Sequence, residues 1–162
     1  MGKMGDVNAR ELKAFEEKLK KLGTTQRDQF MRACAKELAA RLLTKVIKRT
    51  PVGVYPSNSG KTGGTLRRGW TADSQAEAEG GGKSAQAYAD SLKVKKAGGV
   101  YTIEVTNPVE YASYVEYGHR TRNHKGFVKG YSMLTISEDE LRTIAPKVLE
   151  RKLQTYLGDV FK

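Results

Sequence analysis

One stretch of the sequence concentrates the side chains that could do chemistry. Residues 107–127 read NPVEYASYVEYGHRTRNHKGF, in which tyrosines and glutamates come first and a strongly basic segment follows Gly118. Tyrosine and arginine are enriched at the centres of protein interfaces. The carboxylates Glu110 and Glu116 have arginine and lysine nearby, which favours ion pairing over acid–base catalysis. The stretch therefore predicts a contact surface rather than a reaction centre.

Three patterns resemble catalytic or metal sites and fail on spacing. Residues 59–62, SGKT, end like a phosphate-binding P-loop, but the first glycine of that motif would have to stand where the chain has Tyr55. His119 and His124 are the only histidines, and no neighbouring cysteine or carboxylate completes a metal-ligand set. No serine has the flanking glycines of a nucleophile elbow. We expect no enzyme activity, no metal and no cofactor.

The charge of the chain favours an anionic partner. The net charge is +11, from 29 basic and 18 acidic residues, and the stretches 38–72 and 117–137 contain no acidic residue. Basic loops at 61–68 and 119–129, with aromatic residues nearby, could hold a nucleic-acid backbone and stack bases. A free nucleic-acid-binding protein is therefore an alternative, although no zinc finger, ribonucleoprotein motif or convincing helix-turn-helix supports it.

Cysteine usage and hydropathy indicate the compartment. The single cysteine, Cys34, excludes an internal disulfide framework and is expected to be a small buried hydrophobe within a helix. The first residues lack the apolar core of a signal peptide, and no apolar run approaches the ~18 residues that span a bilayer. We expect a soluble protein of a reducing cytoplasm.

Helices are predicted at both ends of the chain. Apolar residues at three- and four-residue spacing predict one helix over 8–22, stopped at Gly23, and a second from near Thr25 that ends before Pro51. A long C-terminal helix should open at a capping box of Ser137 and Glu140, and Pro146 should kink or split it.

Strands are predicted in the middle of the chain. Residues 91–97 and 100–107 alternate apolar and polar side chains around Gly98-Gly99, which predicts a hairpin. Residues 65–70, TLRRGW, could form a helical turn that leads into a strand at Trp70, and residues 127–134 read as a further strand. The predicted fold is α+β, an antiparallel sheet packed against the N-terminal helices and the long C-terminal helix.

A short helix should present the tyrosines. Asn107 can cap a helix over 108–117, Glu110 can complete the capping box, and Gly118 can end the helix in a left-handed conformation.

Residues 73–90, rich in Ala, Glu and Gly, have too little apolar surface to offset the entropy of ordering, which predicts a mobile insertion. The whole chain, with this insertion inside it, reads as one domain over 1–162.

The ordered set of these features resembles a phage family. The matching segments are TPVG at 50–53, GGTLRRGW at 63–70, VTNPVEYASYVEYGHRTR at 105–122 and GFVKGYSML at 126–134. They are similar to the small tail-component, or neck, proteins of long-tailed double-stranded DNA phages and prophages.

The resemblance implies structural work in the virion, with no catalytic residues. Such proteins assemble in the host cytoplasm and act in head–tail joining or tail completion, as an oligomeric ring around the DNA channel. The implied partners are other copies of the chain, head–tail connector proteins, and tail-terminator or tail-tube proteins, with non-specific contact to packaged DNA. The residues expected at the docking surface are Arg67, Arg68, Tyr111, Tyr114, Glu116, Tyr117, His119, Arg120, Arg122, Lys125 and Phe127.

Overall fold

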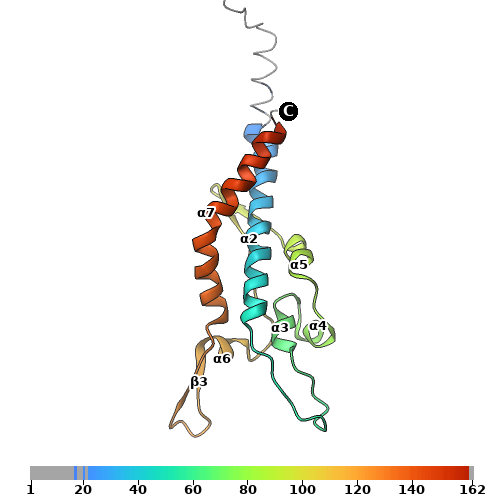
Figure 1. The fold of residues 1–162 in the computed structure, drawn as a ribbon, viewed down its shortest axis with the longest axis vertical. Helices are drawn as coiled ribbons and strands as arrows, with labels where there is room; N and C mark the ends of the chain where they lie inside the picture. Colours follow the sequence, from blue (N-terminus) through green and yellow to red (C-terminus); the bar gives the residue numbers. More distant parts are fainter. Residues whose placement is uncertain (1–16, 18–19, 21, 161–162) are drawn as a thin grey trace, which may run out of the picture.

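Two long helices run side by side and make the molecule elongated (Figure 1). The computed structural model describes residues 17, 20 and 22–160, so most of the helix predicted over 8–22 lies outside the described residues. Helix α2 spans Arg27–Arg49 and helix α7 spans Met133–Val160. A π-helical turn, η1 (Leu22–Gln26), leads into α2. Gly23 lies inside this turn, so the helix end predicted there is wrong.

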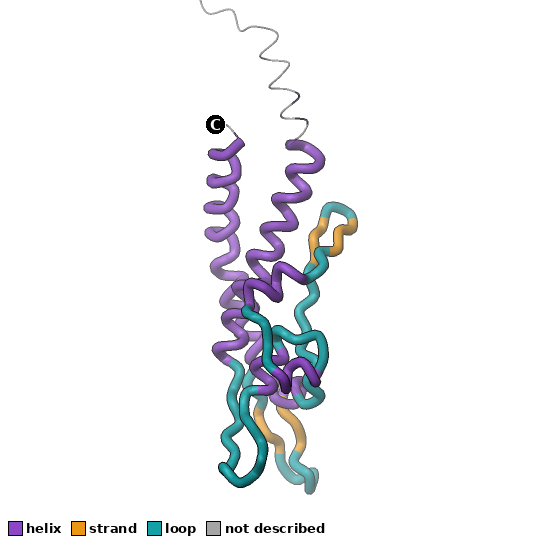
Figure 2. The backbone as a smooth tube through the Cα atoms, turned by 90° about the vertical axis from the view of Figure 1, so that its right-hand side faces the viewer, coloured by secondary structure: helices purple, strands orange, loops and turns teal. Residues whose placement is uncertain are grey.

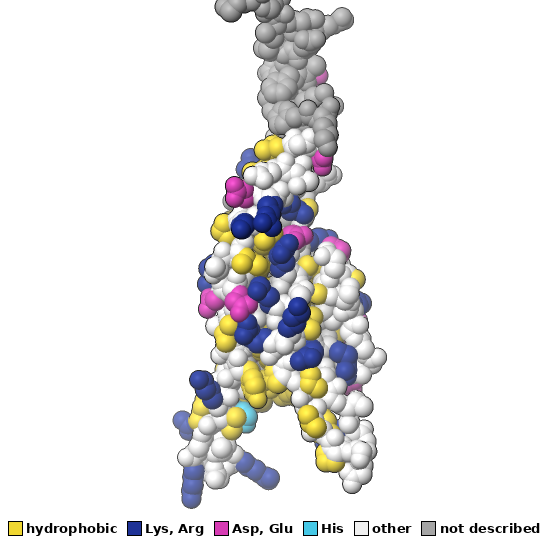
Figure 3. Space-filling view, viewed as in Figure 1, with side chains coloured by type: hydrophobic (Ala, Val, Ile, Leu, Met, Phe, Trp, Pro, Cys, Tyr) yellow, Lys and Arg dark blue, Asp and Glu magenta, His cyan; other side chains and the backbone are white. Residues whose placement is uncertain are grey.

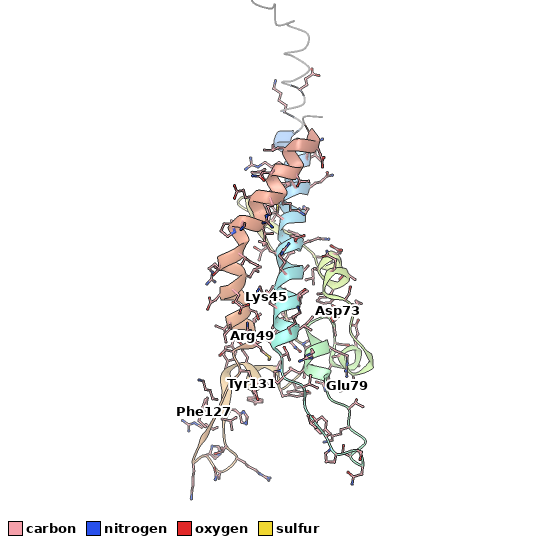
Figure 4. The ribbon with its side chains drawn as sticks, in the orientation of Figure 1. Lys45, Arg49, Asp73, Glu79, Phe127 and Tyr131 are labelled. Carbon is pink, nitrogen blue, oxygen red and sulfur yellow. The ribbon has the colours of Figure 1, made fainter. Side chains whose placement is uncertain are left out.

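Helix α2 is the central element of the core. Its buried face carries Cys34, Ala39, Ala40, Leu42, Leu43 and Val46, and the predicted burial of Cys34 is confirmed. The helix ends where the sequence predicts, because Pro51 excludes helical geometry at the preceding residue and Thr50 is extended, with ψ 125°. Lys45 and Arg49 on a second face of α2 bind Glu140 of α7, which ties the two long helices together (Figure 4).

Trp70 lies in the core, although not at the start of a strand. It follows helix α3 (Thr65–Gly69) and is 3% exposed. Its indole Nε1 donates a 2.8 Å hydrogen bond to Oγ1 of Thr50, whose own hydroxyl donates to the carbonyl of Val46 at 2.6 Å. These two bonds fix the tryptophan against the end of α2 and satisfy every polar atom of that buried contact.

The segment 73–90 is folded rather than an unpacked insertion. It forms helices α4 (Gln75–Gly80) and α5 (Ala85–Ser91), each opened by a serine hydroxyl that accepts a backbone N–H. Ala78, Tyr88 and Ala89 are buried in the core, and α5 packs against α2. The premise of the predicted mobile insertion, too little apolar surface to bury, is therefore wrong. Alanines bury small surfaces individually, but here they allow close approach to neighbouring helices.

The fold is α+β, and its strands form two separate two-stranded ladders instead of one sheet (Figure 2). Strands β1 (Lys95–Ala97) and β2 (Val100–Thr102) pair antiparallel around Gly98 and Gly99, which have φ values of 54° and 80°. The predicted hairpin and its turn are confirmed, but the ladder is only three residues long. Strands β3 (Gly118–Arg120) and β4 (Phe127–Lys129) form the second ladder.

Helix α7 begins earlier than predicted. Its first residue is Met133, and Ser137 lies inside the helix, where its hydroxyl donates to the Met133 carbonyl at 2.6 Å. Glu140 pairs with α2 and does not cap α7, so the predicted capping box is wrong. The helix continues through Pro146 and bends about half-way along its length, so the proline kinks the helix without splitting it (Figure 1). No helix in the part of the chain that the structure describes is long and apolar enough to cross a bilayer.

Candidate docking surface

Two projections extend from the lower end of the molecule (Figures 1 and 2). One is the loop of residues 51–64, which follows α2. The other is the basic hairpin, residues 118–130, which contains β3 and β4. Figure 3 shows a notch between the two projections with hydrophobic side chains at its root. A pocket of about 290 Å³ opens where the loop meets the body, lined by residues that include Tyr55, Leu66, Tyr111, Val115 and Tyr131.

Two glycines make the root of the basic hairpin possible. Gly118 has φ 85° and ψ 175°, so its positive φ agrees with the prediction, but it begins a strand and does not adopt the left-handed helical conformation. A Cβ on Gly118 would lie 2.3 Å from the Val128 carbonyl oxygen, and one on Gly130 would lie 2.2 Å from the Glu116 carbonyl oxygen. The backbones approach too closely for any side chain at either position.

The tip of the basic hairpin is closed by short-range hydrogen bonds. The Thr121 N–H donates to the Gly126 carbonyl at 2.9 Å, and the Gly126 N–H donates to the Thr121 hydroxyl at 3.0 Å. Asn123 Oδ1 accepts from the Lys125 N–H at 3.2 Å. The basic side chains of this segment therefore extend from an internally bonded turn.

The short helix that carries the tyrosines begins later than predicted. Helix α6 spans Ala112–Tyr117. Asn107 does not cap it. Instead its amide Nδ2 donates to the Leu66 carbonyl at 2.9 Å, and its Oδ1 accepts from the Val109 N–H at 3.1 Å. Asn107 thus fastens the segment before α6 to helix α3, which is why the turn that follows holds the tyrosines at the lower end of the body.

Glu116, expected at the docking surface, is buried and binds the start of α7. It is 5% exposed, and its Oε2 accepts from the Leu134 N–H at 2.8 Å. Its Oε1 accepts from the Thr135 N–H at 3.0 Å and from the Thr135 hydroxyl at 2.7 Å. The first N–H groups of a helix have no partner within the helix and carry its positive dipole end, so a buried carboxylate is stabilised there. The structure thus assigns Glu116 to helix capping and not to partner contact.

Arg67 and Arg68 are also used inside the protein. The guanidinium of Arg67 donates twice to the Thr50 carbonyl, at 3.2 and 2.7 Å, where it meets the C-terminal end of α2. Arg68 donates to the Ala78 carbonyl at 2.7 Å and to the Gly63 carbonyl at 3.2 Å. Both side chains are half-buried. Arg67 joins α3 to the end of α2, and Arg68 joins loop 51–64 and α4 to α3. Their expected contact with a partner is not supported by these positions.

The other eight expected residues are exposed at the lower end. Tyr114 and His119 contact each other edge to face with ring centroids 5.8 Å apart, next to the root of the basic hairpin. Tyr117 and Phe127 are the most exposed aromatic side chains of the set, at 71% and 64%. The remaining members are Tyr111, Arg120, Arg122 and Lys125.

The comparison with known families decides the class of the protein. A family described as "Bacteriophage HK97-gp10, putative tail-component" matches residues 13–118, well over half of the 162 residues. The chain belongs to this phage tail-component family. Neither the comparison with curated proteins nor that with solved structures finds a match.

In this tail component the matched region ends at the root of the basic hairpin. The hairpin beyond Gly118 and the whole of α7 lie outside the match, whereas the tyrosines of α6 lie inside it. The resemblance expected from the sequence extended to the C-terminus, so the family is confirmed over a shorter region.

Several exposed hydrophobic side chains of the tail component were missed at the sequence level. Val54, in loop 51–64, is 95% exposed, and Tyr55, Val128 and Tyr131 are also exposed. For Val54 and Tyr55 a local signal could have shown this exposure. Loop 51–64 is rich in Gly, Pro and Ser, and an apolar residue in such a loop has no core to join.

Three observations bear on the chemistry of candidate reactive groups. No group of three or more potential metal ligands occurs within the described residues. Burial raises the pKa of the Cys34 thiol, which keeps it in the less reactive protonated form. Partial burial also raises the pKa of the Tyr111 hydroxyl, so this side chain is a neutral hydrogen-bonding group at physiological pH.

Proposed function

We propose that this chain is a structural virion protein that acts in head–tail joining or tail completion, as one subunit of a ring around the DNA channel. The observation that carries the proposal is the pair of projections at the lower end, whose exposed aromatic and cationic side chains have no partner surface within the described chain. Membership in the phage tail-component family supports the same role. In this role the protein binds and positions other proteins and catalyses no reaction.

The physical argument rests on apolar surface left in water. Burying a large apolar side chain stabilises by about 1.5–3 kcal/mol, so exposing several of them on narrow projections forgoes stability. Val54, Tyr117, Phe127 and Tyr131 are each more than half exposed. Such clusters rimmed by charge mark contact sites. Connector, tail-terminator or tail-tube proteins are the partners that fit the proposed position.

The proposal is tested by changing the surface without changing the fold. Tyr114→Ala and Arg120→Ala, introduced into the phage genome that encodes the chain, should leave the melting temperature of the purified protein unchanged, because both side chains are exposed. Lysates should then contain filled heads and separate tails in electron micrographs. The matched control is Arg142→Ala on α7, an exposed arginine outside the two projections, which should give normal particles.

Two results would count against the proposal. One is a wild-type titre of joined particles from the Tyr114→Ala and Arg120→Ala double variant. The other is tight binding of free nucleic acid that weakens steeply with salt, as release of counterions requires of a nucleic-acid-binding protein. A virion subunit should bind DNA only weakly and without regard to sequence.

A further inference from the structure

The basic hairpin has cations that nothing within the described chain neutralises. Residues 118–130 contain Arg120, Arg122, Lys125 and Lys129 and no acidic residue. All four side chains are exposed, and none forms an ion pair with another described residue. The same segment exposes Phe127 at 64% and Val128 at 46%. The hairpin is thus a protruding element that combines positive charge with apolar surface.

A face of opposite charge lies on helices α4 and α5. We call the acidic face the set Asp73, Glu77, Glu79 and Asp90; the only cation among residues 73–91 is Lys83. Lys83 contacts Glu77 at 3.1 Å and Asp73 at 3.7 Å. Glu79 and Asp90 accept hydrogen bonds from glutamine amides. The Lys36 ammonium donates to the Asp90 backbone carbonyl at 2.5 Å, whereas the Glu79 carboxylate forms no ion pair with another described residue. In a chain of net charge +11 this face is a local excess of negative charge.

The two surfaces lie on opposite sides of the molecule. Figure 4 places Phe127 and Tyr131 on one side of α2 and Asp73 and Glu79 on the other. Tyr131 and Glu79 lie at a similar level along the long axis, Asp73 lies higher and Phe127 lower. One chain therefore cannot bring its basic hairpin to its own acidic face. Two copies placed side by side can do so, and the contact leaves a free hairpin and a free acidic face at the two ends. A head-to-tail contact of this kind closes into a ring when its rotation divides a full turn.

We propose that the basic hairpin of one copy docks on the acidic face of the neighbouring copy, and that this contact repeats around the ring. The inference rests on the proposed function, which supplies the ring, and it names the two surfaces that join the subunits. Complementary charge fixes the register of such a contact and excludes the reverse orientation, in which like charges would meet.

A second copy fits the hairpin better than DNA does. A nucleic-acid backbone would neutralise the four cations but would leave the acidic face unpaired and repelled. The surface beside the acidic face is also open to close approach by a second copy. A Cβ built on Gly80 or Gly81 would have no atom within 4 Å. Phe127 and Val128 can therefore lie against a small-residue surface, with the cations directed to the carboxylates around it.

Crosslinking of assembled particles tests the contact directly. Cys34 is the only native cysteine and is buried, so introduced cysteines react against a low background. A chain with both Arg120→Cys and Glu79→Cys, treated in purified phage particles with a short bis-maleimide, should give a ladder of covalent multimers. Chains with either cysteine alone should remain monomeric. The matched control is Arg120→Cys with Arg142→Cys, which pairs the hairpin with exposed α7 and should give no ladder.

The outcomes separate this inference from the proposed function. A ladder supports the contact. Particles that contain the protein but give no ladder overturn the contact and leave the virion role intact. Particles assembled normally without the protein overturn the virion role itself.

Charge reversal provides a measurement that does not require the cysteine variants to assemble. Arg120→Glu with Arg122→Glu should lower the titre of infectious particles by about tenfold or more, because like charges then face each other. Glu79→Lys should do the same, and its carboxylate accepts only from the exposed Gln75 amide, so the fold should not change. All three changes in one chain should restore the titre, because the charges are complementary again. Failure of the combined variant to exceed both the hairpin variant and Glu79→Lys, while each purified protein melts as wild type, overturns the contact.

Discussion

Replacement of Glu116 by alanine should destabilise the protein although the residue lies among the docking tyrosines in sequence. The change removes a buried carboxylate that accepts from two backbone N–H groups at the start of α7 and from the Thr135 hydroxyl. Those donors then have no partner, and water does not reach them freely because the site is 5% exposed. The loss falls on the folded state alone.

The magnitude follows from the number of bonds lost. A hydrogen bond to a charged group contributes about 1.5–3 kcal/mol and the loss of a helix cap costs about 0.5–2 kcal/mol, and because such terms overlap we expect Glu116→Ala to lower the free energy of unfolding by about 3 kcal/mol. For a chain of this length, about 2–4 °C per kcal/mol gives a fall in Tm of about 6–12 °C. Glu116→Gln keeps an acceptor oxygen and loses the charge, so about half of the effect should remain.

Thermal unfolding by circular dichroism measures this effect, and hydrogen exchange locates it. The amides of Leu134 and Thr135 should exchange faster in Glu116→Ala than the loss of global stability alone explains. The amides in the middle of α2 should exchange faster only by the amount that the loss of global stability explains. Glu138→Ala is the control, since it removes an exposed carboxylate from the same helix and should change stability by less than about 0.5 kcal/mol. If Glu116→Ala has the same melting temperature as Glu138→Ala, the assignment of Glu116 as the cap of α7 is wrong.

Three further outcomes are expected. Thr50→Val should lower the free energy of unfolding by about 1–3 kcal/mol, because the indole N–H of Trp70 loses its buried acceptor. Thr50→Ser keeps the hydroxyl and should keep most of the stability, so equal melting temperatures of the two variants would contradict this. Leu43→Ala should lower the free energy of unfolding by about 2–5 kcal/mol, since Leu43 is fully buried. Leu38→Ala should lower it clearly less, because Leu38 is only half-buried. Urea unfolding measures both values, and the reverse order would contradict this orientation of α2. Burial, aided by a hydrogen bond to a carboxylate, raises the pKa of Tyr88 to about 12. The neutral phenol is therefore favoured in the folded state, so its contribution is complete below about pH 10, the unfolded value, and is lost as the pH rises through about 12; a difference in tyrosinate absorbance between wild type and Tyr88→Phe that already appears near pH 10 would contradict it.

Elements fixed by local rules could be predicted from the sequence. The end of α2 follows from Pro51, and the turn of the β1–β2 hairpin follows from Gly98-Gly99, because each rule acts within a few residues. The long C-terminal helix and its kink at Pro146 follow from periodicity and from the missing N–H of proline. The α+β class follows from the order of these elements.

Elements decided by tertiary contact could not be predicted in detail. Asparagine is a residue type that often caps helices, so Asn107 was predicted to cap one. Its actual partner, the Leu66 carbonyl of α3, cannot be found from sequence spacing. The alanines of 73–90 each carry little apolar surface, and only the fold shows that Ala78 and Ala89 join the core cluster of α2 and Trp70.

The docking set was mixed for the same reason. Tyr114, Arg120 and Phe127 are exposed as expected, whereas Glu116, Arg67 and Arg68 bind helix ends that are distant in sequence. A charged residue beside a predicted surface can equally serve a helix terminus, and only the fold decides between the two.

The way Glu116 joins the hairpin root to α7 has a mechanical consequence. No flexible linker separates the hairpin from the helix, because Gly130 abuts the Glu116 carbonyl and the carboxylate of the same residue holds the first turn. A helix of 28 residues extends roughly 40 Å along its path, so a tilt of about 5° at that pivot would sweep its far end through roughly 3–4 Å. A displacement of the projections would thus be transmitted through α7 to the opposite end of the molecule.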